Sequence, residues 1–268
     1  MRIGTNITAL KGHNNLNKVN EMKAKSFEKL STGKRINSAS DDAAGLAISE
    51  KMNSQIRGMK QSVRNAQDGQ AMVQTAEGAL GEVSDILQRM RELTTQAAND
   101  TYSTTERAKI KTEMDELTSQ IDDIGKNTKF NGSEIFSGDD VTLQVGANSG
   151  ETLTINISEI DANSLSIDSL DIGSNTDASD ALDAIDAALE EVNTQRATLG
   201  SQINRLDCTI SNLNTSIENL SSAESRISDV DMAEEMMNMT KNNILSQAAN
   251  SMLAQSMQAP QSVLQLLG

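Results

Sequence analysis

Aromatic residues are nearly absent from this chain of 268 residues, which contains three Phe, one Tyr and no Trp. A compact core in a chain of this size normally uses many aromatic side chains to fill its volume. The apolar residues are instead Leu, Ile, Val, Met and Ala, the side chains that line the contacts between paired helices. The composition therefore favours a long, thin apolar seam over a thick globular core.

Cysteine and histidine are equally scarce, because Cys208 and His13 are the only residues of their types. A single cysteine excludes an internal disulfide, and these two residues cannot form a metal cluster or a nucleophile with its base. We therefore expect no catalytic residue, no metal site and no cofactor, and interpret the chain as a protein that is not an enzyme. Cys208 is expected on the outward face of its helix.

Basic residues are outnumbered, with 23 Lys and Arg against 38 Asp and Glu and a formal net charge of −15. They do not form clusters interleaved with aromatics, the footprint of many nucleic-acid-binding surfaces. An acidic chain is also a poor match for an anionic membrane surface. The expected partners are proteins, and neither nucleic acid nor membrane.

Long hydrophobic runs are missing as well. No stretch approaches the roughly 20 apolar residues of a membrane-spanning helix. The residues after Met1 are polar and lack the apolar segment of a secretory signal peptide. Taken alone, these absences indicate a cytoplasmic protein.

A regular apolar repeat dominates the C-terminal half. Its positions alternate between spacings of three and four residues over about six heptads, which indicates a coiled-coil helix roughly 70 Å long. Arg196 and Glu224 interrupt the repeat, either to set its register against a partner charge or because they face an opening in the bundle. The positions are Leu182, Ile185, Leu189, Val192, Arg196, Leu199, Ile203, Leu206, Ile210, Leu213, Ile217, Leu220, Glu224 and Ile227.

A helix that could pair with this seam lies upstream, between about residues 56 and 97. It carries two offset apolar stripes, one from Ile56 to Leu87 and one from Met72 to Ala97, so it should contact more than one neighbour. A shorter helix with its own apolar stripe follows. Ser103 and Glu106 have the spacing of a capping box at its start.

The middle of the chain changes to an alternating pattern. Val141, Leu143 and Val145 alternate with polar residues, as do Leu153, Ile155 and Ile157, and a loop with a glycine at each end joins the two runs. This pattern predicts a β-hairpin. The polar, Asp-rich segment after it is expected to form a loop or short strands, until helical periodicity resumes near Asp177.

The fold class that these patterns predict is mainly α. We expect a long antiparallel coiled-coil helical rod formed by the N- and C-terminal halves, with a small β-hairpin element in the middle. Asp41 and Asp42 could form a paired-carboxylate site, but we favour their role as caps of the helix that begins there, since acidic groups suit the positive end of a helix.

The two terminal segments, about 1–40 and 230–268, are amphipathic in places, and the second ends in an apolar tail. Isolated helices of this kind are marginal in water without packing. We therefore predict that they are mobile in the monomer and ordered in an assembly. The residues expected to carry polymerisation are Ile3, Ile7, Leu10, Ile244, Leu245, Met252, Leu253, Leu264, Leu266 and Leu267.

Both ends of the chain resemble bacterial flagellins. The resemblance lies in long motifs that occur in the same order, which is more specific than one short pattern. It covers roughly 1–135 and 176–268. The motifs are LSTGKRINSASDDAAGLAISEKM at 30–52, QRMRELTTQAAN at 88–99, KFNG at 129–132, SRISDVDMAEEM at 225–236, NNILSQAANSMLAQ at 242–255 and the ending VLQLLG.

The resemblance implies a structural subunit that self-assembles into the bacterial flagellar filament for motility. It implies an extracellular location, in the filament, after export without a cleaved signal peptide. Its partners would be further copies of itself, the flagellar export chaperone, and the filament cap and junction proteins. The implied domains are inner-core terminal helices at 1–43 and 225–268, an outer-core helical rod at 44–138 and 176–224, and a β-hairpin and loop at 139–175.

The resemblance also implies a surface that the host flagellin-sensing Toll-like receptor recognises in the monomer and that contacts another subunit in the filament. The alternative is an ordinary helix surface stabilised by pairs three or four residues apart. The residues concerned are Gln88, Arg89, Glu92, Leu93 and Glu113.

Two other functions remain open at this point. A hook–filament junction protein of the flagellum would be similar at both ends but would not polymerise into long fibres. A coiled-coil interaction or secretion-needle protein would share the heptads without the two terminal motifs.

Overall fold

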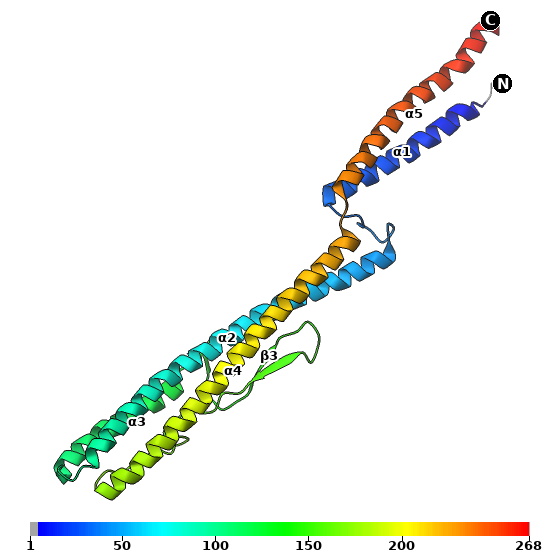
Figure 1. The fold of residues 1–268 in the computed structure, drawn as a ribbon. Coiled ribbons are helices and arrows are strands. Elements are labelled where there is room, and N and C mark those ends of the chain that lie inside the picture. The colour runs from blue at the N-terminus through cyan, green and yellow to red at the C-terminus, as the bar shows by residue number, and fades with distance from the viewer. Residues whose placement is uncertain (1–4, 268) are drawn as a thin grey trace. The chain divides into compact units, whose positions relative to one another are not determined.

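The computed structural model describes the backbone of residues 5–267 and the side chains up to residue 258. Its elements confirm the predicted fold class, a mainly α chain with a small β-hairpin in the middle (Figure 1). The helices are α1 (Ile7–Thr32), α2 (Ala43–Ala97), α3 (Thr104–Asn127), α4 (Asn175–Ser228) and α5 (Met232–Leu267), and the strands are β1 (Lys129–Phe130), β2 (Ser133–Glu134), β3 (Val141–Gln144) and β4 (Thr152–Ile155).

The chain divides into two compact units. The terminal unit contains the chain up to Gln55 and from Asn219 onward, and the central unit is Ile56–Glu218. In the terminal unit, α1 packs along α5. The central unit contains α3, both hairpins and the greater parts of α2 and α4. Most contacts lie within a unit, so each unit has its own packing.

Within the central unit, α2 and α4 run antiparallel. Three polar contacts join them: Gln70 Nε2 donates to Asp207 Oδ1 over 3.0 Å, Arg196 pairs with Glu77 at 2.8 Å, and Arg91 pairs with Asp186. As the residue number rises along α2, that of its partner on α4 falls. The predicted seam of α4 is confirmed, because each of its positions from Leu182 to Ile227 is buried or half-buried. Both stripes of α2 are also buried or half-buried, as predicted.

Local signals place the helix ends where the sequence predicts them. The Ser103 side chain accepts a hydrogen bond from the Glu106 backbone N–H, and the Glu106 carboxylate accepts one from the Ser103 N–H, so the capping box is confirmed. Helix α1 ends at Gly33, whose φ of 71° lies in the left-handed region and whose N–H donates to the Lys29 carbonyl. Glycine adopts this conformation without steric cost, which makes it a common residue after a helix.

The predicted hairpin is confirmed as the antiparallel pair β3–β4, in which Leu143 lies opposite Leu153. It rests on α2, where Asn65 Nδ2 donates to the Gln144 carbonyl over 3.0 Å. Gly69 of α2 leaves room for the end of the Leu143 side chain, which would have to shift to accommodate a Cβ at that position. The hairpin is therefore held against one face of the helix.

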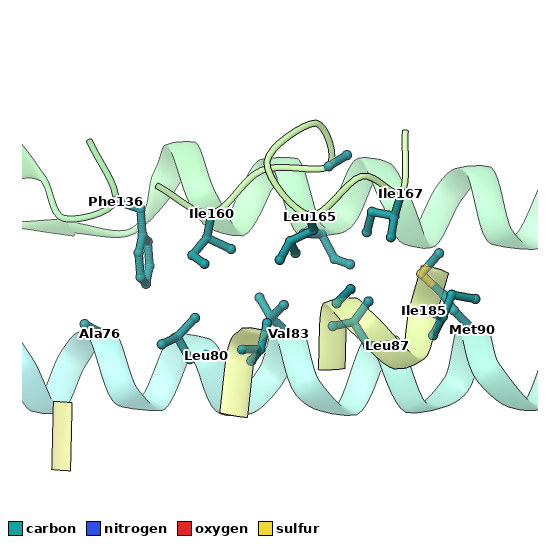
Figure 2. Close-up of a cluster of buried hydrophobic side chains, with 14 of the residues drawn as sticks. Ala76, Leu80, Val83, Leu87, Met90, Phe136, Ile160, Leu165, Ile167 and Ile185 are labelled. Atoms are coloured by element: carbon teal, nitrogen blue, oxygen red, sulfur yellow. The ribbon is translucent and has the colours of Figure 1, made fainter. Parts of the chain in front are cut away.

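The segment after the hairpin, residues 156–174, forms turns rather than strands and contributes more to the core than its polar composition suggests. Ile160, Leu165 and Ile167 are at most 5% exposed. Figure 2 shows their side chains pointing toward α2. Gly125 of α3 lets the Ile160 carbonyl approach so closely that a Cβ there would collide with it. The segment forms one wall of the core, which the sequence pattern alone did not reveal.

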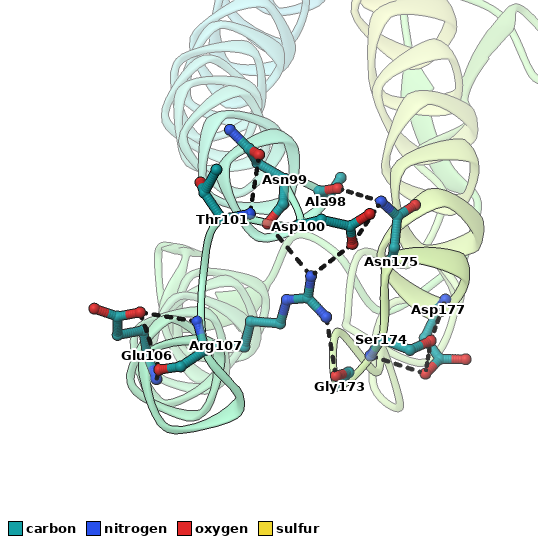
Figure 3. A network of polar contacts seen from close by, with 11 residues as sticks. Ala98, Asn99, Asp100, Thr101, Glu106, Arg107, Gly173, Ser174, Asn175 and Asp177 are labelled. Carbon is teal, nitrogen blue, oxygen red and sulfur yellow. Dashed lines mark hydrogen bonds and ion pairs between the residues drawn. The ribbon is translucent and has the colours of Figure 1, made fainter.

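A polar network joins the ends of three helices at one end of the central unit (Figure 3). The Arg107 side chain is only 10% exposed. Its guanidinium donates to the carbonyls of Asn99 and Gly173, each over 3.3 Å, and to Asp100 Oδ1 over 3.4 Å. Nearby, Asn175 Nδ2 donates to the Ala98 carbonyl over 2.6 Å. Arg107 thus connects the end of α2 and the segment before α4 to the first turn of α3.

Substitution of Ile167 tests whether residues 156–174 are part of the core. Ile167→Ala should lower the free energy of unfolding by about 2–5 kcal/mol, because it removes buried methyl groups and leaves a cavity. The measurement is urea unfolding followed by circular dichroism. Asp168→Ala is the matched control, since this neighbouring side chain is exposed, and it should change stability by less than about 0.5 kcal/mol. Equal effects of the two substitutions would contradict the assignment.

Substitution of Arg107 tests the polar network. Arg107→Ala should cost about 1.5–3 kcal/mol, since it removes the hydrogen bonds that a charged and largely buried donor makes. Arg107→Lys should recover only part of this loss, because an ammonium lacks the planar fork that reaches separate acceptors. Exposed Lys109→Ala is the control in the same unfolding experiment. Full recovery by lysine would show that charge alone matters here.

Candidate functional site

The contact between α1 and α5 in the terminal unit is made largely by small and polar side chains. Ser26 and Asn242 are 5% and 9% exposed. The Ser246 hydroxyl lies 3.2 Å from Asn20 Oδ1, and Asn6 Nδ2 donates to the Ser256 carbonyl over 2.8 Å. Gly12 faces Leu253, whose Cδ1 would lie 3.5 Å from a Cβ at that glycine. Two helices therefore pair without burying most of their large apolar residues.

The large apolar side chains of these helices face solvent instead. Of the residues expected to carry polymerisation, Ile7, Leu10, Ile244, Leu245 and Met252 are between 41% and 71% exposed. Leu253 is half-buried against Gly12. Ile3 and the side chains of Leu264, Leu266 and Leu267 lie outside the described part of the chain.

Further exposed apolar residues in the same unit were not among the predicted set. Phe27, one of only three phenylalanines, is 66% exposed. It lines a groove between α1 and α5 together with Asn20, Lys23, Ala24 and Met239. Exposed methionines accompany it, and three of them, Met232, Met236 and Met237, are close together in the sequence. These additional methionines are Met22, Met232, Met236, Met237 and Met257.

A short stretch of backbone pairing joins the segment that follows α1 to the segment that follows α4. Lys34 and Asp229 form an isolated antiparallel bridge, and the Arg35 N–H donates to the Ser228 carbonyl over 2.7 Å. Ile36 is 3% exposed beside it. These contacts fix the exits of α1 and α4 relative to each other within the terminal unit.

Asp41 and Asp42 have different roles, so the prediction that both cap the helix is wrong for one of them. Asp42 Oδ1 accepts from the Gly45 N–H over 2.9 Å and caps α2. Asp41 Oδ2 instead accepts from the Ser38 hydroxyl and from the Asn37 and Ser38 N–H groups. The hydroxyl bond first, and then the two backbone bonds, hold the pKa of Asp41 below its ordinary value. Asp41 therefore fixes the preceding turn.

The predicted recognition residues lie on α2 and α3 of the central unit. Arg89 pairs with Glu92 and with Glu113, each at 3.0 Å, and all three side chains are about half exposed or more. The hydrogen bond to Glu113, followed by that to Glu92, raises the pKa of the Arg89 guanidinium. Gln88 is exposed beside them. Leu93 is only 3% exposed and belongs to the core below this surface.

The polar residues that interrupt the seam of α4 differ from each other. Arg196 pairs with Glu77 of α2, which agrees with a role in setting the register. Glu224 is half-buried, and no ion pair to it occurs among the described residues. A second pair joins the same two helices several turns away, where the hydrogen bond from Arg91 lowers the pKa of Asp186. Cys208 is exposed, as predicted from its place in the heptad.

In the part of the chain that the structure describes, none of the helices has the length and apolar character needed to cross a membrane. Among the same residues, no three His, Cys, Asp or Glu side chains are grouped so that they could hold a metal ion.

Comparison with known proteins identifies the family. Residues 3–140 match the bacterial flagellin N-terminal helical region, and residues 182–267 match the bacterial flagellin C-terminal helical region. The chain belongs to the bacterial flagellin family. It is 49% identical to a flagellin of Halalkalibacterium halodurans over 271 residues and 46% identical to one of Bacillus subtilis over 303 residues, and each alignment covers the whole of both chains.

Solved structures agree with this assignment. The crystal structure of Bacillus cereus flagellin is 35% identical, with a TM-score of 0.51, and the match covers 60% of this chain and 94% of that one. A putative flagellar hook-associated protein of Vibrio parahaemolyticus has a TM-score of 0.61 at 17% identity, covering 70% of this chain and 100% of that one, which shows a shared fold alone. The alternative of a junction protein is therefore no better supported.

The predicted function is confirmed at the level of the family: this flagellin is a structural subunit of the bacterial flagellar filament, which lies outside the cell. The long motifs at the two ends of the chain were the part of the sequence that identified it.

Proposed function

We propose that this flagellin polymerises through the exposed apolar side chains of α1 and α5, which copies of the chain cover for one another. The observation that supports this most is that the buried residues of α1 and α5 are polar, whereas most of their large apolar residues are exposed. Monomeric proteins rarely expose contiguous apolar surface without a partner. Since burial in a neighbouring copy would remove that surface from water, assembly and ordering of the ends would be coupled.

The distribution of charge supports the same role. The chain up to Gln55 and from Asn219 onward carries 11 Lys and Arg against 10 Asp and Glu, a net charge of +1, whereas residues 56–218 carry 12 against 28, a net charge of −16. A nearly neutral surface permits close packing of identical copies, while a strongly charged one repels them. The terminal unit is therefore the better-suited part of the chain for self-association.

The domains that we propose are those that the resemblance implies. Residues 1–43 and 225–268 would form the inner core of the filament, 44–138 and 176–224 its outer helical rod, and 139–175 the hairpin and loop. The chain would have no enzymatic activity, in keeping with its structural family.

Before and during assembly, other proteins would contact the same surface. The export chaperone would cover the apolar face of α5 until secretion, and the cap and junction proteins would bind the terminal helices at the two ends of the filament. Export without a cleaved signal peptide would leave the subunit in the filament with the mass of the whole translated chain, which mass spectrometry measures directly.

The exposed cluster of Gln88, Arg89, Glu92 and Glu113 would be the surface that the host flagellin-sensing Toll-like receptor recognises. Its support is the exposure of these four side chains and the two ion pairs that hold Arg89 in place. Leu93 is buried in the core, so its role would be to hold α2, and with it the exposed residues of the cluster, in position. In the filament this surface would contact another subunit, so that the receptor would respond to the monomer.

Replacement of exposed apolar residues on α5 tests the assembly surface. The variant with Ile244→Gln and Met252→Gln should keep the helical content of the monomer, because both side chains are exposed there. Its critical concentration for growth from filament seeds should rise by roughly tenfold or more for each substitution, since each loses the burial of one large apolar side chain. Exposed Asn250→Gln is the matched control and should elongate seeds normally. Unchanged growth of the double variant would refute the proposed surface.

Replacement of Arg89 tests the recognition surface. Arg89→Ala should reduce receptor activation by the monomer roughly tenfold or more, in line with the loss of an arginine at the centre of a protein interface. Arg64→Ala is the control, since Arg64 is another exposed arginine of α2 that bonds only to Gln61 among the described side chains. Intact filaments should activate the receptor less than the same mass of monomer. Equal activity of filaments, or of Arg89→Ala, would contradict the proposal.

A further inference from the structure

Methionine is distributed unevenly between the two units. In the central unit, Met59, Met72, Met90 and Met114 are no more than 9% exposed. In the terminal unit, six methionines are between 46% and 71% exposed: Met22, Met232, Met236, Met237, Met252 and Met257. The same amino acid is thus a core residue in one unit and a surface residue in the other.

We propose that the exposed methionines of the terminal unit form a reversible oxidation site, at which a peroxide oxidant prevents the monomer from joining the filament. This inference rests on the proposed polymerisation surface. A thioether sulfur attacks one oxygen of hydrogen peroxide, the O–O bond breaks, and the other oxygen leaves as water. The sulfur is oxidised by two electrons to a sulfoxide, and the peroxide is reduced by the same two electrons.

The positions of these residues make the reaction relevant to assembly. Met237 lies seven and eight residues before Ile244 and Leu245 on α5, and Met252 lies eight and seven residues after them. These spacings place all four on one face of the helix. Met232 and Met236 are one turn apart on another side of the helix and are exposed there. A sulfoxide converts an apolar, flexible side chain into a polar one. Oxidation therefore places polar oxygens within the apolar surface that a neighbouring copy would have to cover.

The reaction and assembly should exclude each other. A methionine covered by a neighbouring copy is shielded from peroxide. Conversely, a methionine that has been oxidised in the monomer is polar, and its burial against a neighbouring copy becomes unfavourable. Reduction by a methionine sulfoxide reductase consumes two thiols, forms one disulfide and one water, and restores the thioether. The modification is consequently reversible in the monomer.

Peptide mass mapping of the full-length monomer tests the chemistry. The background should be Cys208→Ser, because this exposed thiol would otherwise also be oxidised. Under limiting hydrogen peroxide, the six exposed methionines should be oxidised before Met59, Met72, Met90 and Met114. In intact filaments the same six should react several-fold more slowly than in the monomer. Equal rates at exposed and buried positions, or in monomer and filament, would overturn the inference.

Growth from seeds tests the consequence. The oxidised monomer should need roughly tenfold or more protein to elongate seeds than the untreated monomer. Treatment with a methionine sulfoxide reductase and dithiothreitol should restore growth. A variant with Met236→Leu, Met237→Leu and Met252→Leu keeps apolar side chains of similar size, so it should elongate seeds and lose most of its sensitivity to peroxide.

The outcomes separate the two proposals. Normal growth of the oxidised monomer, or full peroxide sensitivity of the leucine variant, would overturn the inference while the polymerisation surface stands. If the untreated monomer fails to elongate seeds, both the polymerisation surface and the inference are wrong.

Discussion

The pairing of α1 with α5 determines the rest of the behaviour of this flagellin. The two helices approach each other through Gly12, Ser26, Asn242 and other small or polar residues, with few large apolar side chains, such as Leu253, half-buried among them. Ile7, Leu10 and Ile244 remain exposed as a result. Because apolar burial is the main favourable contribution to folding, a unit built this way has most of its stabilisation still to gain from contact with other copies.

The central unit is built in the opposite way. Its core is complete, since α2, α3, α4 and the segment 156–174 contribute side chains that are almost fully buried. The ion pairs Arg196–Glu77 and Arg91–Asp186 are only half-buried and contribute little to stability, but they join fixed positions on two long helices. The central unit has a net charge of −16, and its core is complete without neighbouring copies. One chain thus combines a central unit with a complete core and a terminal unit whose apolar side chains would be buried on assembly.

The sequence predicts most of this fold, because its strongest signals are periodic. The seam from Leu182 to Ile227, the two stripes of α2, the capping box at Ser103 and the β3–β4 hairpin each repeat or combine residues at fixed spacings, and each is present in the structure. The terminal motifs identified the family for the same reason: they are long and occur in a fixed order.

The parts that could not be predicted depend on contacts between residues far apart in the chain. The apolar residues of 156–174 are spaced irregularly, so nothing local showed that they cover α2 and α3. Asp41 and Asp42 are adjacent and chemically identical, and only the backbone that each one faces separates their roles. Leu93 belongs to an apolar stripe of α2 and is buried as that stripe predicts, so the resemblance, which placed it on the exposed recognition surface, was the misleading signal. Likewise, no pattern in the sequence showed that α1 and α5 pair through their small residues.

Amide hydrogen exchange on the monomer and on the filament most directly tests the claim that α1 and α5 complete their burial only against other copies. The account predicts fast exchange along α1 and α5 in a dilute monomer, slow exchange across the core of the central unit, and strong protection of the terminal helices once the chain is in a filament. Equally strong protection of α1 and α5 in the dilute monomer would contradict the claim that these helices need other copies to complete their burial.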